Sequence, residues 1–286
     1  MPLPDQLSMR RADLADLPQI VHLRESVGWA VHDWALRAVL EPPDARCMVV
    51  VDEGDHTVGV GSGIAYGALG FVGNMIVDDD HRRRGIGSAI LRSVIEFLAG
   101  RGAVRLELYA TPEGRPLYAA HGFELIGPST VARMPRGVAV PADDIELADG
   151  GPAMIDELVA YDAPRFGGHR RALLGLMLGD ADRPLIVARR DRQVVGYGWV
   201  RPDGERVGPL LADTPEIATA LVGEAFERLP STEGLSLNLP PDNREGAVRL
   251  AELGAELEEW DGRMARGPQV PRREDTVYGM VVGALG

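Results

Sequence analysis

The strongest constraint on the fold is an internal repeat. Three short segments of the first half recur in the second half, in the same order and about 130 residues apart. The three pairs are 56–63 with 193–200, 117–125 with 249–257, and 131–137 with 261–267. A period of this size is that of an ordinary domain, so the 286 residues are predicted to form two copies of one unit. Proline and small residues interrupt both patterns near 137–144, which predicts a first domain at 1–137 and a second at 142–286.

Each copy reads as a mixture of strands and helices. In the first copy a helix begins near Ala12, a second at 33–40 ends before Pro42 and Pro43, and a later one contains Tyr118. The predicted strands lie at 7–10, 47–52, 57–65, 71–77, 104–109, near Phe123 and at 130–134. This order predicts an α/β (α+β) fold, in which each copy is a mixed, mostly antiparallel twisted sheet flanked by helices.

Composition narrows the class of partner. The net charge of −13 argues against nucleic acid or an anionic membrane. It would attract cationic acceptors such as polyamines or aminoglycosides, although a role in solubility alone fits equally well. The single cysteine, Cys47, lies in the apolar run CMVVV and is expected to be a buried strand residue in a reducing compartment. No signal core or long apolar run is visible, so a cytoplasmic protein is expected. All thirty cationic side chains are arginine, and together with abundant alanine, glycine and proline this composition is typical of a GC-rich bacterial gene.

The stretch 78–100, DDDHRRRGIGSAILRSVIEFLAG, places acids, arginines and glycines at the start of an apolar helix. The apolar positions that recur at helical spacing are Ile86, Ile90, Leu91, Val94, Ile95 and Leu98. Gly100 is expected to end this helix as a left-handed cap. The acids 78–80 with His81 are interpreted as a solvated turn, because their spacing matches no common metal site.

The start of this helix has the chemistry of an anion site. Main-chain N–H groups in a first helical turn have no partner, and the helix dipole adds positive charge there. Gly85 and Gly87 leave those donors accessible, and neighbouring guanidinium groups can bind phosphate oxygens. The residues predict a pyrophosphate site, although the bare pattern is also that of an ordinary turn before a core helix. It is neither a Walker loop nor a dinucleotide fingerprint, since GIGSAI lacks the residues that either requires.

With its context, this stretch resembles the GCN5-related N-acetyltransferase (GNAT) superfamily. The signature Arg/Gln-x-x-Gly-x-Gly/Ala is met by Arg82, Gly85 and Gly87, and a tyrosine four residues before a Gly-Phe pair is met by Tyr118. The resemblance covers about residues 5 to 137. The second half, with YDAPRFGGHRRALL and RREDTVYGMVVGALG, looks like the degenerate second domain of bacterial tandem acetyltransferases.

The resemblance implies an acyl-CoA-dependent N-acyltransferase with acetyl-CoA as co-substrate and no metal. It implies that pantetheine lies along the strand edge at 74–77, beside Ile76 and Val77, with the amide near Val77 donating to the acetyl carbonyl. Tyr118 would protonate the leaving thiolate. The residues that would hold the pyrophosphate are Arg82, Arg83, Arg84, Gly85, Ile86, Gly87 and Ser88.

The sequence departs from the superfamily where a base is needed. A glutamate is often found on the fourth strand, and this chain has Asn74 there. An ammonium acceptor must lose a proton before it attacks, so Glu107, His32, Asp33 or a water relay would have to accept it. Trp29, His32 and Trp34 in VGWAVHDW form a candidate wall of the acceptor site, with aromatic packing in the core as the alternative.

The second copy lacks these features. Asp213 stands where an anion would bind, and Leu250 stands at the tyrosine position, while Asn243 survives before the last helix. We therefore expect this copy to bind no CoA and to shape the acceptor site instead. The segment 161–171 is predicted as a substrate-facing loop, with a helix start as the alternative.

These features together predict transfer of an acetyl group from acetyl-CoA to a small-molecule or peptide amine, by direct attack in a ternary complex. Two alternatives stay open at this point. One is an acyl-CoA-binding sensor or structural protein without turnover, and the other is an enzyme that uses a longer acyl-CoA. The acceptor and the oligomeric state do not follow from the sequence.

Overall fold

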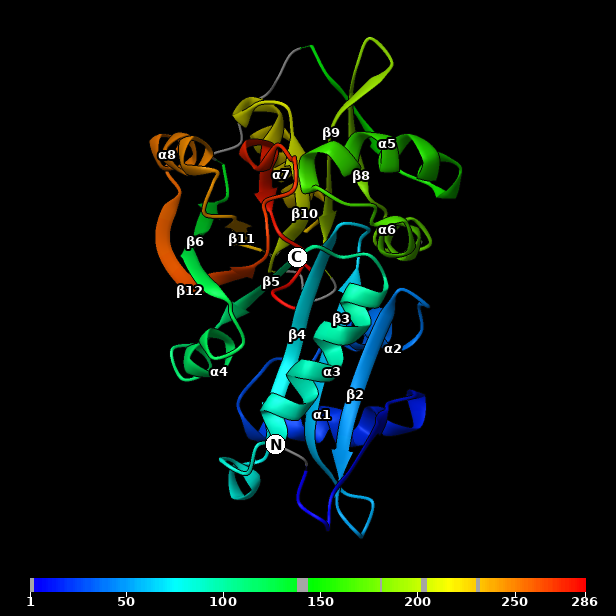
Figure 1. Ribbon diagram of the computed structural model, residues 1–286. Coiled ribbons are helices and arrows are strands. Elements are labelled where there is room, and N and C mark those ends of the chain that lie inside the picture. Colours follow the sequence, from blue (N-terminus) through cyan, green and yellow to red (C-terminus); the bar gives the residue numbers. More distant parts are fainter. Residues whose placement is uncertain (1–2, 138–143, 181, 202–204, 230–231) are drawn as a thin grey trace. The chain divides into compact units, whose positions relative to one another are not determined.

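A computed structural model describes residues 3–137, 144–180, 182–201, 205–229 and 232–286 of the chain (Figure 1). The chain forms two compact units. Unit 1 contains Met1–Leu125, Met264–Val270 and Val282–Gly286, and unit 2 contains Ile126–Arg263 and Pro271–Val281. The predicted boundary near 137–142 falls at residues 138–143, which lie outside the described residues, and it stays a prediction.

Unit 1 is built on a sheet in the order β1-β2-β3-β4-β5. Neighbouring strands are antiparallel except β4 and β5, which are parallel. The elements of the first repeat are β1 (Ser8–Arg11), η1 (Leu14–Asp16), α1 (Leu17–Ser26), α2 (Asp33–Leu40), β2 (Ala45–Val51), β3 (Thr57–Ala65), β4 (Leu69–Val77), η2 (Asp79–His81), α3 (Ile86–Gly100), β5 (Arg105–Ala110), α4 (Arg115–Ala119) and β6 (Glu124–Pro135).

The second repeat has the same succession of strands and helices, which confirms the predicted duplication of an α/β fold. Its elements are β7 (Glu146–Asp149), η3 (Pro152–Met154), α5 (Ile155–Phe166), α6 (Arg171–Leu178), β8 (Ile186–Arg190), β9 (Gln193–Val200), β10 (Val207–Ala212), α7 (Pro215–Arg228), β11 (Gly234–Leu239), α8 (Arg244–Glu252) and β12 (Glu256–Arg266). Two short elements, η4 (Glu274–Thr276) and β13 (Val277–Gly279), follow. In unit 2, strands β13-β10-β9-β8-β7 form an antiparallel sheet.

The last strand of each repeat extends into the unit formed by the other repeat: most of β6 belongs to unit 2, and the end of β12 belongs to unit 1. From Ile126 onward β6 belongs to unit 2, where it pairs with β11, for example Ala132 with Leu237. The last residues of β12, Met264–Arg266, belong to unit 1. Consistent with this exchange, Met264 lies in the buried cluster of unit 1 that contains Tyr118, and Ala132 lies in the buried cluster of unit 2.

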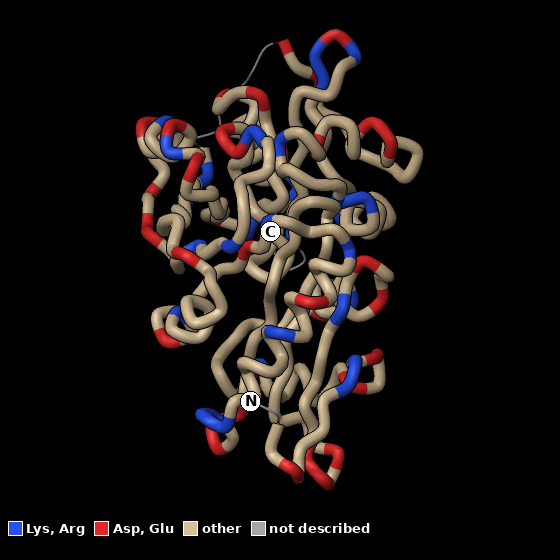
Figure 2. The backbone as a smooth tube through the Cα atoms, viewed as in Figure 1, with Lys and Arg blue, Asp and Glu red and all other residues tan. Residues whose placement is uncertain are grey.

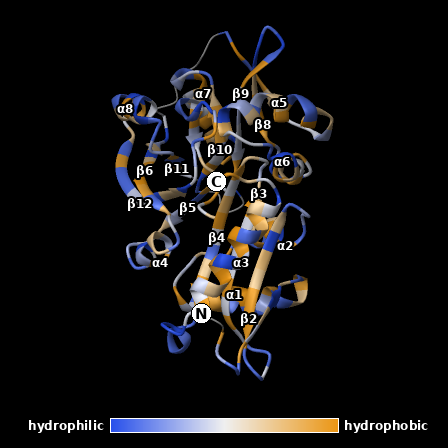
Figure 3. Cartoon of the chain, viewed as in Figure 1, coloured by the Kyte–Doolittle hydropathy of each residue, from blue (hydrophilic) through white to orange (hydrophobic). Residues whose placement is uncertain are grey.

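The repeated glycine motif allows a helix to pack closely on the sheet. Because successive residues of a strand face opposite sides, Gly61 and Gly63 of β3 share one face. A Cβ at Gly61 would lie 2.5 Å from Ile90, and one at Gly63 would lie 2.7 Å from Val94, so both positions require the absence of a side chain. Helix α3 therefore lies directly on β3, and it carries the apolar stripe that the sequence predicts (Figures 1 and 3).

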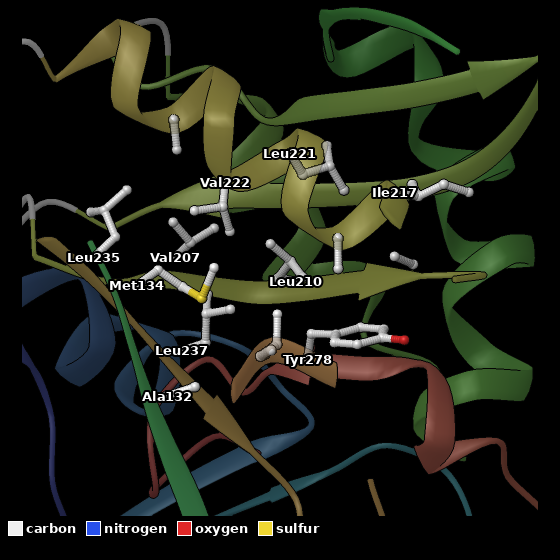
Figure 4. Close-up of a cluster of buried hydrophobic side chains, with 14 of the residues drawn as sticks. Ala132, Met134, Val207, Leu210, Ile217, Leu221, Val222, Leu235, Leu237 and Tyr278 are labelled. Atoms are coloured by element: carbon white, nitrogen blue, oxygen red, sulfur yellow. The ribbon is translucent and has the colours of Figure 1, made fainter. Parts of the chain in front are cut away.

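Unit 2 uses the same arrangement around a larger apolar cluster. Residues of α7, such as Ile217 and Leu221, pack against β10, and Leu237 of β11 belongs to the same buried cluster (Figure 4). Gly196 of β9 faces α7, because a Cβ there would lie 2.9 Å from Ile217. Gly196 thus has the same role as the glycines of β3: the motif recurs because in both repeats a helix packs too closely on the strand to leave space for a side chain.

The structure corrects three sequence-based expectations. One strand, β6, replaces the two short strands predicted near Phe123 and at 130–134. Gly100 is the last residue of α3 and not its left-handed cap; the left-handed residue is Gly102, with φ of +88°. Most of the loop predicted at 161–171 is helical, because α5 continues through Pro164 to Phe166 and Gly167, with φ of +93°, ends it.

Candidate functional site

The start of α3 is an open set of main-chain donors. Gly85 caps the helix with φ of +82°, a left-handed conformation that glycine adopts without strain. A Cβ at Gly85 would meet nothing within 4 Å. The N–H groups of residues 84–88 donate to no described residue, as is expected for a first helical turn. Residues 84–88 therefore present several unpaired main-chain N–H donors at the accessible start of α3.

The arginines before this turn are exposed, and Figure 2 shows acidic and basic residues side by side in the loop. The Arg82 side chain is held by its own loop, since Nη2 lies 2.7 Å from Asp79 Oδ1 and Nε donates to the Val77 carbonyl at 3.1 Å. Both members of this ion pair are exposed, so it is weak and exchangeable. Arg84 lines a polar pocket together with Asp52 and does not stand isolated at the helix start.

The acids of the loop stabilise its turn. Asp78 Oδ1 accepts from the main-chain N–H of Asp80 at 3.1 Å and lies 2.9 Å from His81 Nδ1. These contacts give the residues a capping role at η2. Within the described part of the chain, no group of three or more His, Cys, Asp or Glu side chains is arranged to hold a metal ion.

One edge of β4 is open next to this helix start. Strand β4 pairs with β5 only from Leu69 to Phe71. Beyond Phe71 no described strand pairs with residues 72–77 on that side, while β3 continues to pair with the other edge as far as Val77. The main chain of Ile76 and Val77 can therefore receive an extended ligand in the way a sheet receives an added strand.

A bulge lies in the middle of this open segment. The β3–β4 register shifts so that Asn74 and Met75 oppose Gly61 alone, and Asn74 has φ of +54°. Both polar atoms of the buried Asn74 amide have partners, because Nδ2 donates to Ser62 Oγ at 2.8 Å and Oδ1 accepts from Arg24 Nη1 at 2.5 Å. An amide carries no basic nitrogen, so Asn74 positions its neighbours and does not accept a proton.

The tyrosine helix lies beside the start of α3. Ser88 Oγ and His121 Nε2 are 2.7 Å apart, which ties the first turn of α3 to the residues after α4. A Cβ at Gly87 would lie 3.4 Å from Leu117, the neighbour of Tyr118 in α4. The structure thus brings the two halves of the predicted motif together across about 30 residues of chain.

Tyr118 combines a packed ring with an unpaired hydroxyl. The residue is 7% exposed, and its ring meets Phe123 edge-on, with the ring centroids 6.1 Å apart. No described residue forms a hydrogen bond with its hydroxyl. Burial raises the pKa of Tyr118 to about 12, so the phenol remains protonated at neutral pH and can donate.

The other predicted acceptor-site residues divide into two groups. Glu107 is fully buried in the sheet and accepts from Arg105 Nε at 2.9 Å. Trp29 and His32 lie between α1 and α2, and Trp34 lies in the first turn of α2. The rings of His32 and Trp34 stack with centroids 6.3 Å apart, and Trp29 packs under the Arg24 guanidinium at 5.5 Å.

The equivalent region of unit 2 is closed. Thr214 caps α7 by accepting from the Ile217 N–H at 3.4 Å, and the first helical residue is Pro215, which has no N–H. Strand β13 pairs with β10 on the edge that corresponds to the open edge of β4, with Leu210 opposite Gly279. The chain itself therefore fills the groove, and the Leu250 side chain has no proton to donate.

Comparison with known proteins agrees with this geometry. Residues 158–279 and residues 43–125 each match a family of acetyltransferase (GNAT) domains. The chain is 26% identical over 228 residues to YitH, an uncharacterised N-acetyltransferase of Bacillus subtilis, across 77% of this chain and 78% of that protein. It is 31% identical over 215 residues to a mycothiol acetyltransferase of Frankia alni, across 62% and 64%. A solved structure from Pyrococcus horikoshii shares the fold, with a TM-score of 0.81, 23% identity and coverage of 100% and 98%.

The chain therefore belongs to the GNAT acetyltransferase superfamily. Within it, the two matching domains make this a tandem protein, as the repeat predicts. Members of the superfamily take their acetyl group from acetyl-CoA. No helix among the described residues combines the length and the apolar character needed to cross a bilayer.

Sequence reasoning missed three residues of this region: Arg24, Leu117 and His121. His121 and Leu117 lie within the repeated segment LYAAHGFEL, and this repeat was the available signal. Arg24 carries no such signal, because 50 residues separate it from Asn74 in the chain.

Proposed function

We propose that unit 1 transfers an acetyl group from acetyl-CoA to an amine, with both substrates bound at once. The observation that carries this proposal is a convergence: the free donors of residues 84–88, the open edge of β4 and the free hydroxyl of Tyr118 belong to elements that touch. Holding two reactants in one site can supply about 7 kcal/mol or more of the acceleration.

The pyrophosphate would be held by the main-chain N–H groups of residues 84–88, with Ile86 and Gly87 at the centre. The exposed guanidinium groups of Arg82, Arg83 and Arg84 add charge at the rim, where Arg82 can exchange Asp79 for phosphate. The pantetheine amides would pair with the edge of β4 at Ile76 and Val77.

In the chemical step the amine nitrogen bonds to the thioester carbon and the carbon–sulfur bond breaks. The N–H near Val77 donates to the carbonyl oxygen as negative charge develops there. Tyr118 donates its proton to the departing sulfur, and the proton that the attacking nitrogen loses as the amide forms restores the phenol. The proton of the ammonium must leave before attack, and Glu107 is poorly suited to take it because its carboxylate is buried and paired with Arg105. His32, Asp33 and a water relay remain the candidates.

A short acyl group fits the inner end of the open edge best. Ala284 packs against Gly73, two residues beyond the last paired residue of β4, and a Cβ at Gly73 would lie only 2.4 Å from that of Ala284. Tyr66 holds the same segment by donating to the Leu285 carbonyl at 2.8 Å. This filled space supports acetyl-CoA over longer donors, and turnover with a series of acyl-CoAs of increasing length tests that preference.

Calorimetric titration with acetyl-CoA tests the binding site. Gly87→Asp places a carboxylate among the proposed phosphate donors, and one like charge about 4 Å away costs about 4 kcal/mol at an effective dielectric constant of about 20. We expect at least a 100-fold loss of affinity. An acid in the first turn favours the helix itself, so the variant should remain folded.

The matched control is Gly100→Asp, the same substitution in the last turn of α3, where an added side chain meets nothing within 4 Å. It should bind acetyl-CoA with wild-type affinity. Failure of the wild-type protein to bind acetyl-CoA saturably, or equal losses in the two variants, would refute the proposed function.

A sensor without turnover is the second candidate, and the replacement of the usual glutamate by Asn74 favours it. Such a protein would bind acetyl-CoA at the same residues. It would release no free thiol with any amine, and replacing Tyr118 would then have no kinetic effect.

A further inference from the structure

Arg24 is a half-buried cation whose observed partners are all neutral. Its Nη1 donates to Asn74 Oδ1 at 2.5 Å and its Nη2 donates to the Ala30 carbonyl at 2.6 Å. The guanidinium lies over the Trp29 ring at 5.5 Å. Its Nε is buried and has no partner among the described residues. Two of the five N–H donors of this side chain are therefore satisfied, and none of them meets a carboxylate.

Three of the four buried arginines among the described residues are compensated by a carboxylate, and the fourth, Arg201, donates to the Val281 carbonyl at 3.4 Å. Arg105, Arg170 and Arg263 each pair with a carboxylate inside their own unit, at 2.5–2.9 Å. Burying a charge is unfavourable unless an opposite charge or several hydrogen bonds compensate it. Desolvation alone accounts for the lowered pKa of Arg24, which is consistent with the absence of a compensating carboxylate.

The position of Arg24 is fixed by two left-handed residues. Gly28, with φ of +71°, ends α1 so that the Trp29 N–H bonds to the Arg24 carbonyl at 2.9 Å, which places the Trp29 ring near the guanidinium. On its other side Arg24 holds Asn74, whose φ of +54° belongs to the bulge in the open segment of β4. A cation is thus built in next to the segment along which the thioester would lie.

We infer that Arg24 binds an anionic group of the acceptor, so that the substrates of this site are amines that also carry a carboxylate or a phosphate. This inference rests on the proposed function. A guanidinium binds a carboxylate or a phosphate through two parallel hydrogen bonds. The ligand would then supply the negative charge that the observed partners of Arg24 lack. The same cation would repel polyamines, so the net charge of the whole chain is a poor guide to the acceptor.

A purely structural Arg24 would support Asn74 and be indifferent to acceptor charge. Two pairs of amines that differ only in one anion separate the two roles: L-phenylalanine with L-phenylalaninamide, and glucosamine 6-phosphate with glucosamine. Affinities are measured by calorimetry on protein saturated with CoA, where no turnover occurs. Rates of thiol release from acetyl-CoA give kcat and KM for the same compounds.

We expect the anionic member of at least one pair to bind 10-fold or more tightly than its neutral partner. Arg24→Gln should abolish that ratio by raising KM for the anionic compound, and Arg24→Lys should keep part of it. Arg101→Gln removes a partly exposed arginine at the far end of α3 and should leave the ratio unchanged. The pair that responds identifies carboxylate or phosphate as the group bound.

Equal affinities within both pairs, no measurable binding of any of the four compounds, or a ratio that survives in Arg24→Gln would overturn the inference. If Arg24→Gln does not fold, the ratios of the wild-type protein still decide between the outcomes. Normal acetyl-CoA binding without anion preference would overturn this inference alone, whereas failure to bind acetyl-CoA would overturn the proposed function as well.

Discussion

Replacement of Tyr118 by phenylalanine separates chemistry from folding, because the hydroxyl has no described partner. The variant keeps the ring and its edge-on contact with Phe123. No buried donor or acceptor loses a hydrogen bond, so the free energy of unfolding should change by no more than about 0.5 kcal/mol. The melting temperature should then move by at most about 2 °C.

The catalytic effect should be large by comparison. A positioned general acid contributes about 10²- to 10⁴-fold in rate, which corresponds to roughly 3–5 kcal/mol of the barrier. We expect Tyr118→Phe to lower kcat by such a factor, measured by thiol release, while calorimetry gives an unchanged Kd for acetyl-CoA. Because burial raises the pKa of Tyr118 to about 12, this phenol should cause no decline in the wild-type rate up to about pH 11.

Tyr161→Phe is the contrasting control. In unit 2 the Tyr161 hydroxyl donates to the Val195 carbonyl at 2.8 Å, so its removal breaks a buried hydrogen bond, although that carbonyl still accepts from the Asp213 N–H at 2.9 Å. That variant should lose about 0.5–1.5 kcal/mol of stability and keep its turnover. Turnover of Tyr118→Phe within about threefold of wild type would refute the assignment of the acid.

Two further outcomes follow from titratable groups. Burial raises the pKa of the Cys47 thiol to about 12, so Cys47 should resist thiol reagents at pH 8 in the folded protein and react fully in denaturant; rapid labelling of the native state would contradict this. Desolvation, with Arg92 and Arg266, lowers the pKa of His121 below 6.5, so below that pH the unfolded chain binds more protons and stability should fall as the pH drops. His121→Gln should weaken this dependence in melting curves at pH 8 and pH 5.5, and identical curves for the two proteins would exclude the histidine as its source.

Local signals predicted those elements whose causes are local. The proline pair 42–43 ends α2 at Leu40 as expected, and the alternation of glycine with larger residues defines β3 at the predicted bounds. The start of α3 could also be predicted from local sequence, because a strand, a glycine turn and an amphipathic helix follow one another directly along the chain.

Features that depend on distant partners could not be predicted in this way. Asn74 adopts a left-handed conformation within a bulge whose partners, Arg24 and Ser62, come from other elements. The closing of the unit 2 groove by β13 depends on a segment about 65 residues beyond β10. The loop expected at 161–171 was inferred from its glycines and charges, although within it only residues 167–170, between α5 and α6, are not helical.

Residues 264–270 and 282–286 of the second repeat belong to unit 1, which gives the second repeat a structural role in the first. Met264 contributes to the apolar cluster around Tyr118, and Leu285 accepts a hydrogen bond from Tyr66. Deleting the second repeat would therefore remove interior atoms of the first. We therefore expect that neither repeat folds without the other. A chain cleaved between residues 137 and 144 should refold only when both fragments are mixed.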